Sequence, residues 1–418
     1  MNEEKPTAKL EDTAADAATA LASEPMPEAD TAPAADKAAA AQAAIAPDTA
    51  AASTDPGEPV TPEGAPLHGV ARVRALGKSL LTGVAFVLVG LLVLYGASRV
   101  FEPKSNGNVG GVHAAHVAAN GFLGEPENSL DALFIGDSET YSAVSPVEIW
   151  KAGGAATYTC AIGGQNLTYS RTLLERALKV QKPRVVMIEG NSLFKPFDEN
   201  KLLKSTIKDL FPIFERHDRW KALTPRDFFG ATENDYVDDM KGFRMKWGIR
   251  PADDSAYMEP TDNVAEVPEL TKSVLAEMRD MCRAAGSELV IVSTPSTKCW
   301  YTSRHNGAQA VADELGIEFI DLNTGDDAVA IDWETDTRDW GDHLNYAGAV
   351  KTSQALAHIL RERYGAPDHR DDPAYAVEWN RAVRHHDRLV EKGSAMAVVG
   401  KPGDAVTIME LPPLYNPA

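Results

Sequence analysis

The sequence predicts an α/β domain built on a parallel sheet with helices on both faces, preceded by a disordered tail and one transmembrane helix. Three observations predict this organisation. Residues 1–70 are acidic and rich in Ala and Pro, residues 79–98 are an uncharged apolar run, and from about Leu130 short apolar runs alternate with segments of helical period. Such alternation is typical of βαβ units, whose crossover helices cover both faces of a parallel sheet.

The N-terminal tail is the most acidic part of the chain. Residues 1–68 hold 13 Asp and Glu, three Lys and 22 Ala, and no aromatic residue, so half of the formal net charge of −20 lies there. This composition cannot bury enough apolar surface to offset the entropy that ordering costs. We therefore expect residues 1–70 to be disordered. Because phosphate contacts need clustered Lys and Arg, the strong acidity also argues against a nucleic-acid partner.

The apolar run at residues 79–98 is long enough to cross a membrane. Its 20 residues carry no charge, and a helix of that length rises about 30 Å, the thickness of a bilayer core. A buried core helix would usually keep a polar stripe, which this run lacks. Arg72, Arg74 and Lys78 precede it and Arg99 and Lys104 follow it, so the excess of basic residues on its N-terminal side is mild. By the positive-inside rule we expect a retained single-pass anchor, with the tail in the cytoplasm and the C-terminal domain outside.

The pattern of apolar residues divides the rest of the chain, residues 100–418, into three parts. We expect a linker over residues 100–129, the α/β domain over 130–365, with a less regular insert over 194–266, and a C-terminal extension over 366–418. The predicted strands cover residues 131–138, 156–164, 183–192, 287–296 and 317–323. The predicted helices between and after them cover residues 144–153, 167–181, 269–286, 307–316 and 345–365. In the extension, residues 376–393 look helical and residues 404–411 look like an edge strand.

The insert holds aromatic residues whose purpose the sequence leaves open. Trp220 and Trp247 lie there with several Phe and Tyr. They could form a lid or a glycan platform, or they could simply pack.

Polar residues gather where the predicted strands end. Ligands on a parallel sheet bind outside the carboxyl ends of its strands, and Ser138, Gly164, Asn191 and Thr294 all fall at such ends. A serine hydroxyl is a weak nucleophile and needs a base, usually His, which a third group orients. Taken singly, Ser138 could be a turn or cap residue, and Asn191 a structural turn residue.

The strongest base candidate is His343, in a loop just before the last helix of the domain. Asp336, Asp339 and Asp342 precede it closely, so the chain order is Ser, Asp, His. His343 could instead satisfy a backbone carbonyl, and the aspartates could be caps. The other histidines are weaker candidates. His305 lies at the same sheet edge, His217 lies in the insert, and His385 and His386 are expected to be solvated in the terminal helix.

The three cysteines form no metal-binding spacing. Cys282 and Cys299 are expected to be too far apart to pair, whereas Cys160 and Cys299 would follow strands at one sheet edge and could pair. All three could equally be small buried residues.

Four segments resemble the SGNH/GDSL hydrolase superfamily: FIGDSETY, IGGQN, IEGNS and DWGDHLN, over about Leu130 to Tyr364. The likeness is nearest to membrane-anchored Gram-positive proteins. It is carried by HLN at 343–345, TPS at 294–296 and PDHR at 367–370, and extends to about Trp379. It is more distant to the extracytoplasmic partners of membrane-bound O-acyltransferases that modify teichoic acid or alginate. The resemblance implies a flavodoxin-like three-layer α/β/α fold, a Ser-His-Asp catalytic group and an oxyanion hole with three donors.

By this resemblance Ser138 is the nucleophile and His343 the general base. The oxyanion hole would consist of the Ser138 N–H, the Gly164 N–H and the Asn191 side chain, although Gln165 or Asn166 could supply the amide.

The acid is displaced from its usual place in the superfamily. It normally lies three residues before the histidine, where this chain has Trp340. Asp339 is the preferred acid, because the adjacent Asp342 reaches the ring less easily, and Asp342 is the alternative.

These expectations combine into a membrane-anchored extracytoplasmic esterase or O-acyltransferase. It would act on acyl groups of a cell-envelope polymer or acyl carrier, with a membrane-bound O-acyltransferase as the expected partner. The alternative is a non-catalytic partner or scaffold of such an acyltransferase. No phosphate loop or metal-ligand spacing occurs, so we expect no cofactor and no metal.

Overall fold

The computed structural model describes residues 68–107, 110 and 112–395. Most of the predicted tail and the edge strand predicted at 404–411 therefore lie outside the described residues. The strands are β1 (Ala132–Gly136), β2 (Thr157–Ala161), β3 (Val185–Glu189), β4 (Glu288–Ser293) and β5 (Glu318–Asp321). The longer helices are α2 (His68–Phe101), α5 (Pro146–Gly153), α6 (Leu167–Leu178), α7 (Glu199–Leu210), α10 (Glu269–Ala285), α11 (Thr302–Leu315), α12 (Tyr346–Tyr364) and α13 (Pro373–Ala395).

Short helices complete the described part of the chain. They are α3 (Ala114–Ala119), η1 (Gly121–Gly124), α4 (Ser138–Ala143), η2 (Gly190–Phe194), α8 (Ile213–Arg216), η3 (His217–Ala222), α9 (Pro225–Phe229) and η4 (Gly325–Asp327).

The five strands form one parallel sheet in the order β2-β1-β3-β4-β5. This is the flavodoxin-like doubly wound order, which places a crevice where the connections reverse direction, between β1 and β3. Strands β1, β2 and β3 are buried along their whole length, as expected where helices cover both faces. The predicted parallel α/β fold is confirmed.

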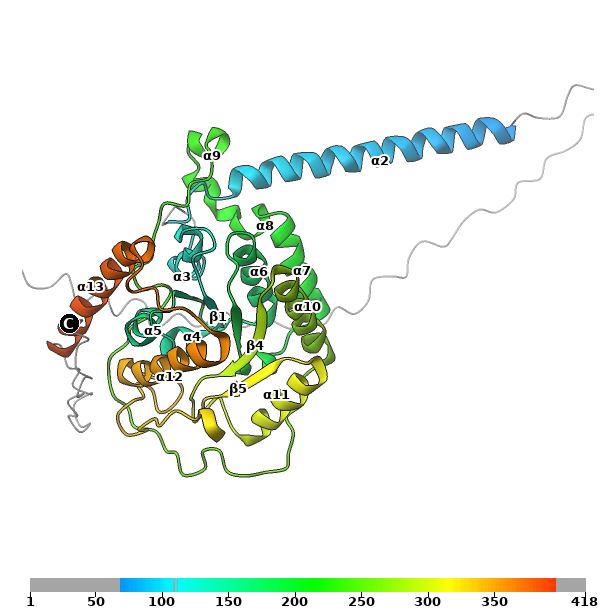
Figure 1. Cartoon of the computed structure of the whole chain (residues 1–418). Helices are drawn as coiled ribbons and strands as arrows, with labels where there is room; N and C mark the ends of the chain where they lie inside the picture. Colours follow the sequence, from blue (N-terminus) through cyan, green and yellow to red (C-terminus); the bar gives the residue numbers. More distant parts are fainter. Residues whose placement is uncertain (1–67, 108–109, 111, 396–418) are drawn as a thin grey trace, which may run out of the picture. The chain divides into compact units, whose positions relative to one another are not determined.

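Successive side chains of each strand enter opposite layers of the core, as the pleat requires. On one face Leu133 and Ile135 of β1 pack with residues of α6, α10 and α11. On the other face Ala132 and Phe134 pack with residues of α5 and α12. The sheet thus lies between two helical layers, with α5 and α12 on one side and α10 and α11 on the other (Figure 1).

Capping residues set several helix boundaries where the sequence places them. The side chain of Ser145 caps α5, and Pro146 stands in its first turn, where a missing N–H costs nothing. Asn345, the predicted N-cap of α12, accepts hydrogen bonds from the N–H groups of Ala347 and Gly348. Gly286 ends α10 in a left-handed conformation.

Helix α2 contains the predicted apolar run. Residues Leu76–Phe101 have a mean hydropathy of 2.4, and none of the apolar window is buried by the rest of the protein. Leu80 and Phe86 are 71% and 80% exposed. By length and composition this helix can cross a bilayer.

The segment expected to be a linker, residues 100–129, contains α3 and η1, and Phe122 within it is fully buried. Next to it, Lys241 of the insert is fully buried. Its Nζ donates to Glu125 at 2.7 Å and to Glu378 of α13 at 2.9 Å. Three separate segments of the chain therefore meet in one buried ionic cluster.

Helix α13 packs on α5, where the rings of Trp150 and Trp379 stack with centroids 4.6 Å apart. The expectation that His386 is solvated is wrong, because its side chain is fully buried. The Nε2 of His386 lies 3.3 Å from Glu148, which also pairs with the buried Lys151. The ring of His386 also packs against Tyr346, with ring centroids 5.6 Å apart, so it is enclosed beneath α13.

We predict that Lys241→Met lowers the free energy of unfolding by about 3–5 kcal/mol, because it leaves the carboxyl of Glu125 buried without its cation. Burial raises the pKa of Glu125 to about 7, against the opposing charge of Lys241. The double variant Lys241→Met/Glu125→Gln should recover part of the loss. Guanidinium unfolding of the full chain in detergent micelles measures this. A single variant as stable as wild type would contradict the role given to the cluster.

Candidate active site at the carboxyl edge of the sheet

Ser138 lies where β1 turns into α4. Asp137 caps the helix by accepting the N–H of Glu139 at 3.1 Å, and Ser138, the first helical residue, is partly buried. A Cβ at Gly136 would collide with the side chains of Thr140 and Glu189, so the strand end needs glycine there. The Ser138 N–H is one of the helix donors that find no partner within the helix. The turn therefore presents a hydroxyl and a free N–H together.

His343 is held by Asp339, four residues earlier. The Nδ1 of His343 lies 2.7 Å from one carboxylate oxygen of Asp339, and the backbone N–H of His343 donates to the other oxygen, also at 2.7 Å. Burial raises the pKa of Asp339, but these two hydrogen bonds outweigh burial, and the pKa lies below its usual value. The carboxylate can therefore fix the tautomer that places a proton on Nδ1.

The loop conformation allows Asp339 to reach the ring of His343 from four residues earlier. Trp340 and Gly341 adopt left-handed conformations, with φ of 61° and 89°. Residues Thr337 and Leu344 form an antiparallel bridge at the base of the loop. Two consecutive left-handed residues make a tight turn that brings Asp339 back over His343.

Asp342 occupies a second position beside the same ring. One of its oxygens lies 3.3 Å from His343 Nδ1, and the other lies 3.1 Å from the Cys299 thiol. Asp339 makes the shorter contact and also accepts the backbone N–H of His343, so its geometry suits the orienting role better.

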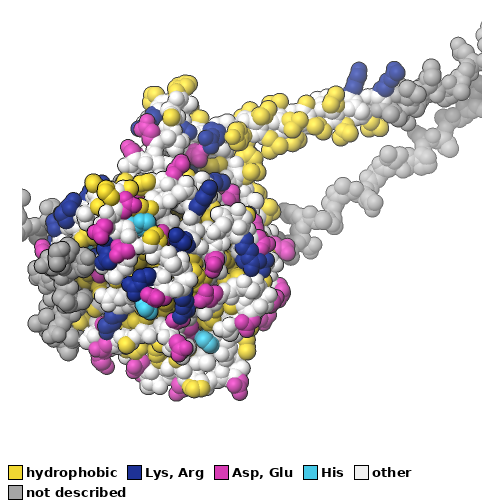
Figure 2. Space-filling view, viewed as in Figure 1, with side chains coloured by type: hydrophobic (Ala, Val, Ile, Leu, Met, Phe, Trp, Pro, Cys, Tyr) yellow, Lys and Arg dark blue, Asp and Glu magenta, His cyan; other side chains and the backbone are white. Residues whose placement is uncertain are grey.

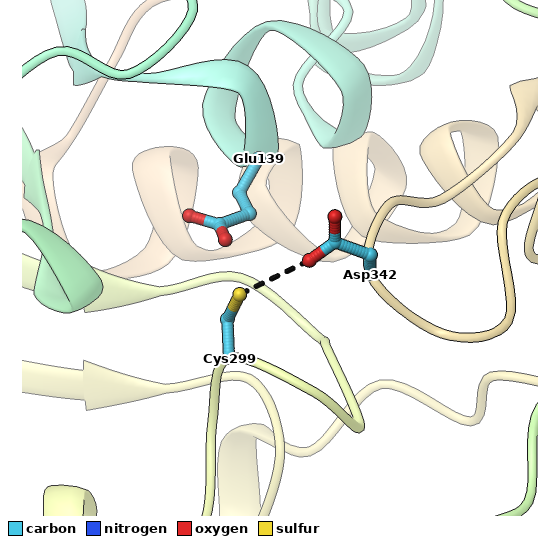
Figure 3. A group of neighbouring side chains, drawn as sticks. All are labelled: Glu139, Cys299 and Asp342. Carbon is cyan, nitrogen blue, oxygen red and sulfur yellow. Dashed lines mark hydrogen bonds between the residues drawn. The ribbon is translucent and has the colours of Figure 1, made fainter. Parts of the chain in front are cut away.

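The serine turn and the histidine loop lie next to each other. Polar atoms of Glu139, Cys299 and Asp342 all lie within 4.8 Å of one another. Glu139 directly follows Ser138, and Asp342 directly precedes His343. Figure 3 shows the three side chains converging from α4, from the loop after β4 and from the loop before α12. The Nε2 of His343 is buried and has no hydrogen-bond partner among the described residues.

Asn191 follows β3 and is 5% exposed. Its Nδ2 donates to both carboxylate oxygens of Glu139, at 2.9 and 3.1 Å. Its Oδ1 accepts from Arg304 at 2.5 Å. The amide is therefore fixed from both ends and directed at the residue after Ser138.

Gly164 lies in an exposed turn after β2, with φ of 67°. A Cβ on the preceding Gly163 would lie 3.7 Å from the Tyr141 hydroxyl, so the turn runs beside α4. The side chain of Gln165 accepts a hydrogen bond from the Ile162 N–H and donates one to the Ser170 hydroxyl, so both ends of its amide have partners.

Asn166 caps α6 through its carbonyl oxygen, which accepts the Thr168 hydroxyl at 2.6 Å and the Tyr169 N–H at 3.4 Å. Gln165 has partners at both ends of its amide, as Asn191 does, so the choice of Asn191 as the third donor stays a prediction.

Glu189 lies directly beneath the site. It is 1% exposed at the end of β3, and it accepts hydrogen bonds from Thr294 N–H at 3.2 Å, Thr294 Oγ1 at 2.9 Å and Thr140 Oγ1 at 3.4 Å. Burial, and then the charge of Glu139, raise its pKa to about 8. The carboxyl is therefore mainly protonated at neutral pH, and it joins three segments of the sheet edge.

Sequence reasoning missed four residues of this site: Glu139, Glu189, Cys299 and Arg304. Glu189 did give a signal, because an acid at the end of an apolar strand has to be neutralised or paired when it is buried. The others give none, since the side chains that bond to them across the site are 43 or more positions away in the chain.

Other candidates have structural partners. Asp336 pairs with Lys351 at 2.6 Å, and His305 contacts Asp321 at 2.5 Å. All three cysteines are free, so the Cys160–Cys299 pairing is absent. Trp247 packs on Tyr346 with ring centroids 5.1 Å apart.

Among the described residues, two groups have the donor spacing of a metal site: Glu139 with Cys299 and Asp342, and Asp339 with Asp342 and His343. Cys299 suits a metal poorly, because burial raises the pKa of its thiol well above the usual range and the thiolate is the form that ligates. In the second group the Asp339 carboxylate is already bonded to His343. Absence of a bound metal stays a prediction.

Comparisons with known proteins give a likeness of fold. No family model matches the chain, and no curated protein matches it in sequence. Among solved structures, a GDSL-like lipase of Bacteroides thetaiotaomicron is 11% identical, with a TM-score of 0.29 over 56% of this chain and 87% of that one. A lipase/acylhydrolase of Enterococcus faecalis is 11% identical, with a TM-score of 0.30 over 56% of this chain and 97% of that one. We infer neither an activity nor a substrate of this protein from these two similarities.

We predict that Glu189→Gln weakens the pH dependence of stability between about pH 4.5 and 8. A carboxyl whose folded pKa is raised stabilises the fold fully below its unfolded pKa, and this contribution is lost as the pH rises through the folded pKa. With a folded pKa of about 8, the loss in wild type amounts to at most about 5 kcal/mol.

Chemical unfolding of wild type and Glu189→Gln at pH 5 and pH 8.5 checks this. Other buried acids, such as Glu125, titrate in both proteins, so the difference between the two isolates Glu189. Equal pH dependence in the two proteins would contradict a protonated Glu189.

Proposed function

We propose that the protein is a membrane-anchored, extracytoplasmic serine esterase or O-acyltransferase that acts on acyl groups of a cell-envelope polymer. The observation that carries the proposal is the orientation of His343. Its Nδ1 is bonded to Asp339, and its buried Nε2 has no partner among the described residues. An imidazole whose Nδ1 is held by a carboxylate and whose Nε2 has no partner can accept a proton from a serine nucleophile at Nε2.

In the proposed reaction Ser138 Oγ attacks the acyl carbonyl carbon, and His343 Nε2 accepts the hydroxyl proton. The carbonyl oxygen becomes an oxyanion, for which the Ser138 N–H, the Gly164 N–H and the Asn191 amide are the proposed donors. Each such donor is worth about 3 kcal/mol to the transition state. When the tetrahedral intermediate collapses, the departing alcohol oxygen takes the proton from His343, and the acyl group stays on Ser138.

The second half of the reaction mirrors the first. His343 removes a proton from an incoming water or alcohol, whose oxygen attacks the acyl carbon, and the Ser138 oxygen leaves and is reprotonated. Water gives hydrolysis, and a sugar or polyol hydroxyl gives transfer. The exposed turn at Gly164 would leave one side of the site open to a polymeric acceptor.

The proposed location rests on α2 and on the residues before it. The helix is long and apolar enough to span a bilayer. Arg72, Arg74 and Lys78 precede its apolar run, which favours an N-terminus inside and a catalytic domain outside. An extracytoplasmic domain would meet envelope polymers, which is the basis for the proposed substrate class. A partnership with a membrane-bound O-acyltransferase is proposed from the sequence resemblance alone.

One contact favours the alternative of a non-catalytic partner of such an acyltransferase. The Asn191 amide donates to Glu139, and a carboxylate there opposes the negative charge of an oxyanion. A catalytic site would need Glu139 to move aside or to be neutralised when substrate binds, whereas a scaffold would not.

We predict that Ser138→Ala and His343→Ala each lower the hydrolysis of p-nitrophenyl acetate by a factor on the order of 10³ or more, because each removes part of one catalytic unit. The double variant should be no slower than the single ones. Steady-state assays of the full chain in detergent, with circular dichroism to verify folding, measure this. Activity retained in Ser138→Ala would contradict the proposal, and an inert wild type would favour the scaffold.

We predict that Asp339→Asn costs activity by a factor on the order of 10², since the amide cannot hold the same imidazole tautomer. Asp342→Asn is the matched control, an identical change beside the same ring, and should cost less than about tenfold. The two variants are compared by kcat/KM at one pH. A larger loss in Asp342→Asn would assign the acid to Asp342.

A further inference from the structure

The insert carries an exposed apolar stripe. Along α7, Leu203, Ile207 and Leu210 are 57%, 39% and 64% exposed and recur at intervals of four and three, so they share one face of the helix. Contiguous exposed apolar surface of this kind usually marks an interaction site. Lys204 and Lys208 lie between these residues and are exposed.

Further along the insert, three exposed aromatic side chains lie close to the end of α2. Trp220 is 63% exposed, Phe228 55% and Phe229 90%. Figure 2 shows hydrophobic side chains at the tip that carries α9. Trp is enriched at the boundary between lipid and water, and Phe is typical of the apolar face of helices that lie in that boundary.

A buried arginine ties these aromatics to α2. Arg219 is 2% exposed, and its guanidinium donates to the Phe101 carbonyl at 2.5 Å and to Asp227 at 2.6 Å. Asp227 immediately precedes Phe228 and Phe229, and Trp220 immediately follows Arg219. Arg219 therefore links the end of α2 to Asp227, and the three aromatic residues lie next to Arg219 or Asp227 in the chain. We call Phe101, Arg219 and Asp227 with these three aromatic residues the arginine unit.

A cavity of about 350 Å³ lies beside the arginine unit, and its lining includes residues 102–103 and 105–107, Arg176 of α6 and Arg216. The guanidinium of Arg216 has no hydrogen bond or ion pair to any described side chain. The nearby acids have other partners: Asp209 and Glu215 pair with Arg176 at 3.5 and 3.7 Å, and Glu102 pairs with Arg99 at 2.5 Å. The cavity thus offers an unpaired cation to an anion.

We propose that the surface formed by α7, η3 and α9 docks on the bilayer surface from which α2 emerges. Trp220, Phe228 and Phe229 enter the boundary between headgroups and acyl chains, and Arg216 faces anionic headgroups. The inference rests on the proposed anchoring by α2. A lipid occupant follows from continuity with the end of the apolar helix, and the unpaired Arg216 matches the charge of anionic lipids.

The test uses the full chain in nanodiscs, with Cys299→Ser to remove the least buried thiol. Phe229→Cys is labelled with an environment-sensitive fluorophore, and lipids with a spin label near the headgroup serve as quencher. Val377→Cys on α13, where the native residue is 80% exposed, is the matched control. Val93→Cys, within α2, reports the anchor. We expect blue-shifted, strongly quenched emission at position 229 and water-like, unquenched emission at position 377.

Anionic phosphatidylglycerol in the nanodisc should increase quenching at position 229, and Arg216→Gln should abolish that increase. Quenching at position 93 but not at 229 would overturn the docking proposal and favour a protein partner on this face. No quenching at 93 would overturn the anchor and the docking together. Neither readout depends on Ser138, so failure here and failure of the proposed chemistry are distinguishable.

Discussion

The buried carboxyl of Glu189 holds together the sheet edge on which the candidate site stands. It ends the central strand β3 and accepts hydrogen bonds from Thr294, after β4, and from Thr140, in α4. Ser138 lies two residues before Thr140, and Asn191 lies two residues after Glu189. Because its raised pKa keeps Glu189 neutral, this junction carries no additional negative charge beneath a site that already contains Glu139, Asp339 and Asp342.

Much of the fold follows from the sequence for physical reasons. Strands covered on both faces must be continuously apolar, so β1 and β3 were recognisable, and caps such as Asn345 and Gly286 mark helix boundaries through local hydrogen bonding. The buried environment of His386 was not predictable, because Glu148, which lies 3.3 Å from its ring, is 238 residues away in the chain.

The candidate site was only partly predictable. The positions of Ser138, Asn191 and His343 at one edge follow from the parallel order of the strands. The contact of Asp339 with His343 depends on the left-handed pair Trp340 and Gly341, and a left-handed tryptophan has no sequence signature. The engagement of the Asn191 amide by Glu139 and Arg304 joins three separate segments, which no local pattern encodes.

The central claim is that Ser138 is an activated nucleophile, and a covalent adduct tests it most directly. The full chain in detergent would be treated with a fluorophosphonate, digested and sequenced by mass spectrometry. We predict one adduct, on Ser138, in wild type and its loss in His343→Ala. A folded wild type without an adduct on Ser138, or with equal labelling of Ser138 in His343→Ala, would contradict the claim.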